Sequence, residues 1–133
     1  MASQIKKGIE LLDDRAGNGP VAVKGAVVTY NARFFLRRGD EVRPDALSIA
    51  TYGSRLNTRI IDGVEVVDHV TTLGRRQSIA GVENSLYGMQ SGGYREVRVS
   101  PHVAYGENGI KDLIPANALL RIQLWVNDVQ NGH

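Results

Sequence analysis

Few side chains in this sequence combine the residue types and spacing that covalent or metal chemistry needs. The chain contains no cysteine, which excludes thiolate ligands, thiol nucleophiles and disulfides. Its three histidines, His69, His102 and His133, share no helical or strand spacing, and no repeat of carboxylates accompanies them, so we expect no metal site. No serine lies in the Gly-x-Ser-x-Gly pattern of a hydrolase nucleophile. Metal catalysis and nucleophilic hydrolysis are therefore poorly supported.

The size and composition of the chain are those of an ordinary globular domain. Of its 133 residues, 42% are hydrophobic and 23% are charged, so it can bury a core without disulfides, and we predict a single domain over residues 1–133. A net charge of +2 with scattered basic residues gives no sign of nucleic-acid binding. Because no apolar run suits a signal peptide or a membrane helix, we expect a cytoplasmic protein without membrane contacts.

Strand-forming patterns dominate the chain. A run of β-branched residues over Val21–Tyr30, continued by residues 32–36, predicts one long strand. Two short apolar runs flank Asp62-Gly63, a dipeptide that suits the positive φ angles of a type I′ turn, and predict a hairpin. Val97 and Val99 face one side of a further strand. The last strand alternates in the same way, with Leu120, Ile122, Leu124 and Val126 on one face, and the opposite face leaves Trp125 exposed.

One segment has the periodicity of an amphipathic helix. Apolar residues recur at steps of three and four between Ile79 and Met89, which predicts a short helix there. Ser78 suits the N-cap position and Gly92-Gly93 suit the exit. A single short helix beside several antiparallel strands predicts an α+β domain in which the sheet wraps the helix.

Motifs spread over residues 8–129 resemble the FKBP-type peptidyl-prolyl cis-trans isomerases. The motifs, in chain order, are the strand, Gly-x-Gly turn and second strand of 8–32, Leu73-Gly74, Ile79-x-Gly81, Gly88-Met89-x-x-Gly92-Gly93, Ser100-Pro101, Ala104-Tyr105-Gly106 and Ile114-Pro115. This resemblance implies a five-stranded antiparallel half-barrel around the helix. Residues 45–70 exceed the family's minimal length and read as an added hairpin or loop, either a flap that grips substrate or an elaborated surface loop.

The resemblance also implies an activity and a pocket. It implies isomerisation of X-Pro bonds in proline-containing polypeptides, without a cofactor, between the helix and the inner face of the sheet. The catalytic positions would be Tyr105, through its hydroxyl, and Ile79, through its backbone N–H. The remaining pocket positions implied by the resemblance are Tyr30, His69, Val82, Ile110, Ile114 and Ile122.

Several aromatic side chains typical of this pocket are replaced. Val82 stands where the family usually has Trp, while Ile122 and His69 stand at Phe positions. The family's Phe-Asp pair has no clear match in residues 35–45, although Val42 or Asp40 lies nearby in sequence. Two readings therefore stay open: an isomerase with a depleted pocket, or a catalytically weak module that binds a peptide or protein partner. We expect either to be a monomer.

Overall fold

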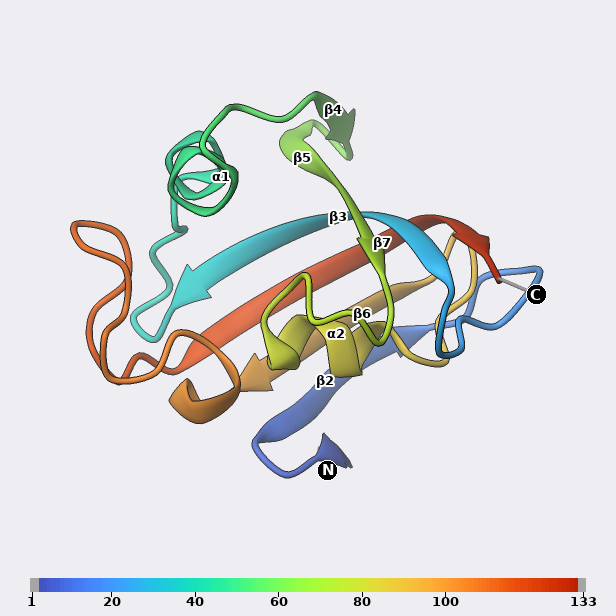
Figure 1. Cartoon of the computed structure of the whole chain (residues 1–133), viewed down its shortest axis with the longest axis horizontal. Helices are drawn as coiled ribbons and strands as arrows, with labels where there is room; N and C mark the ends of the chain where they lie inside the picture. The colour runs from blue at the N-terminus through green and yellow to red at the C-terminus, as the bar shows by residue number, and fades with distance from the viewer. Residues whose placement is uncertain (1–2, 132–133) are drawn as a thin grey trace.

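The computed structural model describes residues 3–131, and these form one antiparallel sheet of seven strands beside two α-helices (Figure 1). The strand order across the sheet is β1-β2-β6-β7-β3-β5-β4. The strands are β1 (Ser3–Lys6), β2 (Ile9–Arg15), β3 (Val27–Leu36), β4 (Thr58–Ile61), β5 (Val64–Thr72), β6 (Tyr94–Val99) and β7 (Leu120–Gln130). The helices are α1 (Pro44–Tyr52), α2 (Ala80–Leu86) and a short 3₁₀ turn, η1 (Pro101–Val103). The predicted α+β class with an antiparallel sheet is confirmed.

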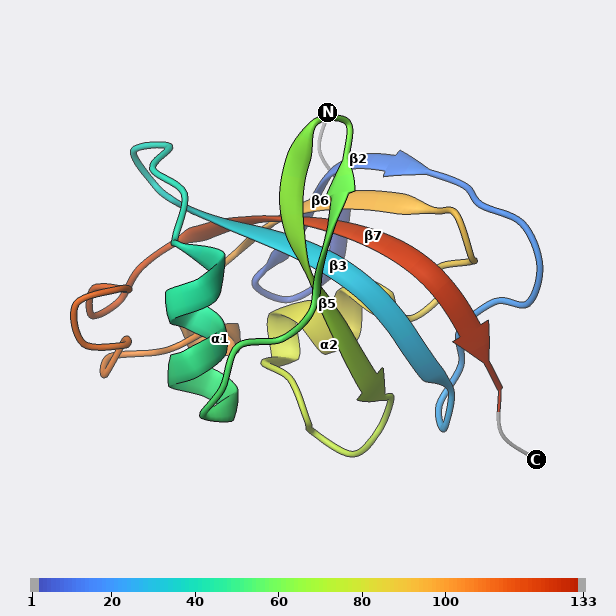
Figure 2. The same ribbon diagram turned by 90° about the horizontal axis from the view of Figure 1, so that it is seen from above.

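Two strands, β1 and β4, flank the five of the predicted half-barrel. Five strands, β2, β6, β7, β3 and β5, make the expected curved sheet, which bends over α2 (Figure 2). Strand β1 extends it at one edge by pairing with β2. The predicted hairpin joins β4 to β5, so that β4 extends the sheet at the other edge. The Asp62-Gly63 turn of this hairpin has the expected positive φ angles of 50° and 80°.

The core lies between α2 and the concave face of the sheet. Strand β7 alternates as predicted, and the four apolar residues predicted to share one face, Leu120, Ile122, Leu124 and Val126, are all buried. They pack with Val97 and Val99 of β6 and with Val82 and Leu86 of α2. Burial of each such side chain is worth roughly 1.5–3 kcal/mol, so this layer fixes how the sheet curves over the helix.

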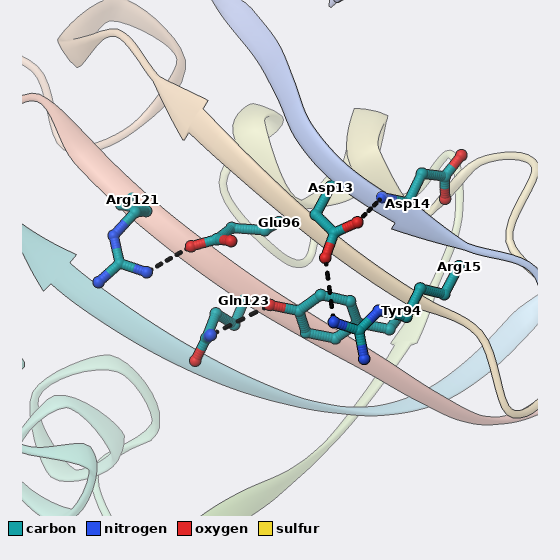
Figure 3. A network of polar contacts seen from close by, with 7 residues as sticks. All are labelled: Asp13, Asp14, Arg15, Tyr94, Glu96, Arg121 and Gln123. Atoms are coloured by element: carbon teal, nitrogen blue, oxygen red, sulfur yellow. Dashed lines mark hydrogen bonds and ion pairs between the residues drawn. The ribbon is translucent and has the colours of Figure 1, made fainter. Parts of the chain in front are cut away.

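Charged and aromatic side chains cover the convex face of the sheet (Figure 3). Arg121 pairs with Glu96 across β7 and β6, and the Gln123 amide donates to the Tyr94 hydroxyl at 3.0 Å. Trp125, expected to be exposed, is half-buried because its ring packs against that of Tyr94, with 5.2 Å between their centroids. Aromatic contacts across neighbouring strands therefore cover part of this face.

The long strand predicted from Val21 begins only at Val27. Within residues 21–26, Ala22 instead bonds to the segment that follows α2: its N–H donates to the Met89 carbonyl, and the Gly88 N–H donates to the Ala22 carbonyl, both at 2.9 Å. Gly25 and Ala26 bond to the backbone of Leu73, just beyond β5. With their backbone groups engaged there, these residues cannot join the ladder of the sheet, despite their β-branched side chains.

Helix α2 is shorter than its periodicity predicts. Ile79, rather than Ser78, is its N-cap, and no side chain caps it. The helix ends at Leu86, not near Gly92-Gly93, because Arg95 donates from one guanidinium nitrogen to the carbonyls of Ser85 and Tyr87, each at 2.8 Å. The Arg95 guanidinium thus satisfies the last carbonyls of the helix, in place of the termination at Gly92-Gly93 that the sequence predicted.

The second helix, α1, was not predicted. It lies in the chain between β3 and the hairpin, inside the segment expected to be an insertion. Pro44 stands in its first turn, and Gly53 ends it with a left-handed backbone at φ 81°. Within residues 3–131, no helix is long and apolar enough to span a membrane.

Candidate functional site

A cavity of about 280 Å³ lies between α1, the concave face of the sheet and the segment that leads into α2. Strands β3 and β5 supply its wall, and α1 closes it on the side away from α2. Its lining residues are Tyr30, Ala32, Arg33, Phe34, Val42, Pro44, Leu47, Ser48, Thr51, Tyr52, Val67, His69, Gln77, Ser78, Ile79, Val82 and Tyr105. The cavity is concave and mostly apolar, as small-ligand sites usually are.

Five of the eight predicted site residues line this cavity. They are Tyr30, His69, Ile79, Val82 and Tyr105, which come from β3, β5, the N-cap and first turn of α2, and the loop after η1. Segments separated by up to 75 positions in sequence thus meet at one point. The order of these residues in the sequence does not bring them together, whereas the curvature of the sheet over α2 does.

The other three predicted residues do not line the cavity. Ile122 is fully buried in the core under the sheet. Ile110 and Ile114 pair with each other through backbone hydrogen bonds of 2.8 Å and line a separate shallow hollow in the 108–116 loop. Ile114 is also buried, so its side chain packs into the core beneath this loop.

An aromatic wall runs along one side of the cavity. The imidazole of His69 stacks on the ring of Tyr30, with 5.0 Å between centroids and 17° between planes. Tyr52 of α1 packs on His69, with centroids 5.9 Å apart, and its hydroxyl lies 3.4 Å from the His69 Nδ1 atom. His69 therefore joins the sheet to α1, and the three rings offer a flat surface to an apolar ligand.

Burial shifts the pKa of every titratable ring in this wall. Burial lowers the pKa of His69 to about 4, against a weaker opposing effect of the neighbouring Asp68 carboxylate, so the imidazole is neutral at pH 7. Burial raises the pKa of Tyr105 to about 12, and that of Tyr30 further still, helped by the hydroxyls of Tyr52 and Tyr105. At neutral pH the wall carries no charge, and its polar groups act only through hydrogen bonds.

Three polar groups at the cavity have no hydrogen-bond partner within residues 3–131. The Ser78 hydroxyl is buried and unpaired. The Tyr105 hydroxyl and the backbone N–H of Ile79 likewise donate to no atom of the described part of the chain. Buried donors are normally satisfied, so these groups are available to carbonyl oxygens of a ligand.

Sequence reasoning missed the contribution of α1 to the cavity. Leu47, Ser48, Thr51 and Tyr52 of this helix all line it. Proline in the first turn and glycine just beyond the last are usual helix boundaries, and Pro44 and Gly53 stand in those places. That signal marked α1 in the sequence. Val42 also lines the cavity, whereas Asp40 does not.

The donor set of the described residues does not suggest a metal site. No group of three or more His, Asp or Glu side chains within residues 3–131 is placed to hold an ion. His133, weighed above as a candidate ligand, lies outside the described residues. What the cavity offers is apolar surface, neutral aromatic rings and a few directed donors.

Comparison with known proteins identifies the relatives of this chain. The sequence model of the FKBP-type peptidyl-prolyl cis-trans isomerase family matches residues 20–124. FK506-binding protein 1A of Neurospora crassa is 32% identical over 99 residues, which cover 72% of this chain and 80% of that protein. Peptidyl-prolyl cis-trans isomerase FKBP11 of Bos taurus is 40% identical over 81 residues, or 60% of this chain and 40% of that protein.

A longer relative matches over a small part of its length. Peptidyl-prolyl cis-trans isomerase FKBP10 of Homo sapiens is 35% identical over 81 residues, which cover 59% of this chain but only 14% of the human protein. The match therefore concerns one domain of a much larger protein.

Proposed function

The chain belongs to the FKBP-type peptidyl-prolyl cis-trans isomerases, and from that premise we propose that the cavity between α1 and the sheet isomerises X-Pro bonds in polypeptides. The observation that carries this proposal is the convergence of Tyr30, His69, Ile79, Val82 and Tyr105 on one mostly apolar cavity. An apolar surface for the proline ring then lies beside unpaired donors for the neighbouring carbonyls.

The chemistry follows from the electronic structure of the peptide bond. Rotation about an X-Pro amide breaks its conjugation, at a barrier of about 18–20 kcal/mol, and takes tens to hundreds of seconds without a catalyst. The twisted amide is less dipolar than either planar isomer. A dry, uncharged cavity that grips the proline ring therefore binds the twisted form more tightly than the planar ones, which lowers the barrier.

Each side of the cavity has a distinct role in this proposal. Val82 forms the floor beneath the proline ring, and the stacked rings of Tyr30 and His69 form the wall. The Ile79 N–H and the Tyr105 hydroxyl hold carbonyl oxygens on either side of the bond. Tyr52 supplies aromatic surface from α1, and so offsets part of what Val82 lacks relative to the tryptophan common in the family.

The test is acceleration of the proline-limited refolding of a substrate protein. Tyr105→Phe removes the cavity hydroxyl, and Tyr94→Phe removes a matched hydroxyl from the convex face, where Tyr94 bonds to Gln123. We expect wild type and Tyr94→Phe to accelerate refolding equally, and Tyr105→Phe to be about three- to tenfold slower, because one hydrogen bond contributes about 0.5–1.5 kcal/mol. No acceleration by wild type at stoichiometric concentration would refute the proposed activity and leave peptide binding as the role of the fold.

The proposal extends to the setting in which the protein works. We propose a cytoplasmic monomer that binds single proline-containing segments. The absence of cysteine fits a reducing compartment, and the large exposed apolar side chains of the described residues come from several separate elements. Light scattering at micromolar concentration tests the monomer, and a mass of two chains would contradict it.

A further inference from the structure

The segment that leads into α2 brings two polar side chains to the cavity to which the proposed isomerisation gives no role. They belong to Gln77 and Ser78, which both line the cavity. The Ser78 Oγ atom is buried and has no hydrogen-bond partner among residues 3–131. It has no capping role either, because Ile79 is the N-cap of α2 and no side chain caps that helix. Buried hydroxyls are normally paired, so this one is suited to contact a ligand.

The side-chain amide of Gln77 is held at its oxygen end. Its Oε1 atom accepts the Thr72 N–H at 2.7 Å. Because a backbone N–H can only donate, this bond identifies which end of the amide is the oxygen. The Nε2 atom, with two protons to donate, is therefore the end of Gln77 that can bind a ligand.

The donors of Gln77 and Ser78 are not needed for the backbone of the substrate. In the proposed function, the Ile79 N–H and the Tyr105 hydroxyl already hold the carbonyl oxygens on either side of the X-Pro bond. Other polar side chains of the cavity are engaged within the protein. The Ser48 hydroxyl donates within its own helix at 2.8 Å, and Arg33 donates to Glu41 at 2.7 and 3.0 Å.

We propose that Gln77 and Ser78 form a subsite for the side-chain amide of an Asn or Gln residue that precedes the proline. This inference rests on the proposed function, because it adds one side-chain contact to the same X-Pro substrate. With the proline ring on Val82, the side chain of the preceding residue is the other one that belongs to the rotating bond. The Ser78 hydroxyl and the Gln77 Nε2 donate to the amide oxygen, which has two lone pairs, and the Ser78 oxygen can accept from the amide nitrogen.

The subsite suits a neutral polar side chain better than a charged or an apolar one. The guanidinium of Arg33, a cation at the cavity, is bound by the Glu41 carboxylate, and His69 is neutral at pH 7. A substrate carboxylate would therefore lose its water without gaining a cation. An apolar side chain would leave the Ser78 hydroxyl buried and unpaired in the complex. The amide avoids both costs.

Three capped peptides, Ala-Asn-Pro-Ala, Ala-Leu-Pro-Ala and Ala-Asp-Pro-Ala, test this inference. Leucine and aspartate have nearly the shape of asparagine but lack its neutral amide. The readout is the catalysed isomerisation rate of each peptide at pH 7, from exchange spectroscopy. We expect wild type to process the Asn peptide at least as fast as the Leu peptide and faster than the Asp peptide. Ser78→Ala should lower the ratio of the Asn rate to the Leu rate by about three- to tenfold, the effect of one hydrogen bond.

Two further variants separate recognition from general structure. Gln77→Glu keeps an oxygen for the Thr72 N–H but removes the Nε2 donor, so it should also lower the Asn-to-Leu ratio. Thr71→Val removes another buried, unpaired hydroxyl, which does not line the cavity, and should leave the ratio unchanged. A ratio that Ser78→Ala does not change, or an Asp peptide processed as fast as the Asn peptide, would overturn the inference while the isomerase proposal stands. If wild type accelerated none of the three peptides, both would be overturned.

Discussion

Lowering the pH should destabilise this protein through His69 before the neighbouring Asp68 carboxylate contributes. The pKa of this imidazole is about 4 in the folded chain, because burial disfavours its charged form, and 6.5 in an unfolded chain. The unfolded chain therefore binds a proton between these two values that the folded chain does not. Stability is lost as the pH falls from 6.5 toward 4.

The size of the effect follows from the same two pKa values. A difference of two and a half pH units sets an upper limit of about 3 kcal/mol, at 1.36 kcal/mol per unit. Between pH 7 and pH 5 the expected loss is about 2 kcal/mol, or roughly 6–10 °C in Tm for a chain of this length. Asp68 acts at lower pH. Burial raises the pKa of its carboxyl, but hydrogen bonds from Arg59 and Asn31 outweigh burial and lower this pKa below 3.8. Protonation of Asp68 therefore destabilises the folded protein only near and below that pH.

The assay compares urea unfolding of wild type and His69→Phe at pH 7, 6 and 5. Phenylalanine keeps the stack on Tyr30 but cannot be protonated, so the variant should lose about 2 kcal/mol less than wild type over this range. The groups around His69, namely Tyr30, Tyr52 and Asp68, do not titrate between pH 5 and 7, and the difference isolates the imidazole. Identical pH slopes in the two proteins, or an NMR titration of His69 near 6.5, would refute the reasoning.

Two substitutions test other parts of the framework. Gly109→Ala would place a Cβ in steric overlap with the Ile114 carbonyl oxygen, on a backbone with φ 57°. We expect it to lower the free energy of unfolding, measured in urea, by at least about 2 kcal/mol. The control Gly39→Ala also has a positive φ but open space around its Cβ, so its loss should be smaller. Asn31→Val removes a fully buried amide that bonds to the Val67 carbonyl, Asp68 and Asn127, each at 2.7 Å, and should lower the free energy of unfolding by about 2–3 kcal/mol; a change below 0.5 kcal/mol would contradict a structural role for this network.

The sequence predicted those elements whose side-chain pattern agrees with their final packing. Strand β7 alternates because one face is buried against α2, and the Asp62-Gly63 hairpin depends on local backbone preferences alone. The pattern failed where backbone bonding decided the outcome. The β-branched run from Val21 does not start a strand, because the backbone of Ala22 bonds to Gly88 and Met89. No local feature of the sequence indicates a partner so distant along the chain.

The candidate site was likewise predicted only in part. Tyr30, His69, Ile79, Val82 and Tyr105 follow family motifs whose spacing the chain retains, and they meet at the cavity. Ile110 and Ile114 pair with each other in their own loop, and neither lines the cavity. The wall supplied by α1 had no counterpart in those motifs. Only Pro44 and Gly53, the residues at the ends of this helix, could have predicted it from the sequence.

Helix α1 should be the part of the site that opens most easily. Leu47 and Ser48 are its buried residues, and the Ser48 hydroxyl bonds within the helix, to the Pro44 carbonyl at 2.8 Å. Leu47, at 7% exposure, is thus the one large apolar anchor. Deleting such a side chain from a cooperative core costs about 2–5 kcal/mol, but a helix with a single anchor can detach alone, which limits the loss that global unfolding reports.

We therefore expect Leu47→Ala to separate activity from stability. Isomerisation should fall by about tenfold or more, because the α1 wall and Tyr52 leave the cavity, while the free energy of global unfolding should fall by less than about 2 kcal/mol. Backbone amides of α1 should lose hydrogen-exchange protection, and those of β3 and β7 should keep it. Ile49→Ala, a matched deletion at a 47% exposed position of the same helix, should change none of these. If α1 stayed protected and activity were unchanged, the helix would be a surface addition and the cavity would work without it.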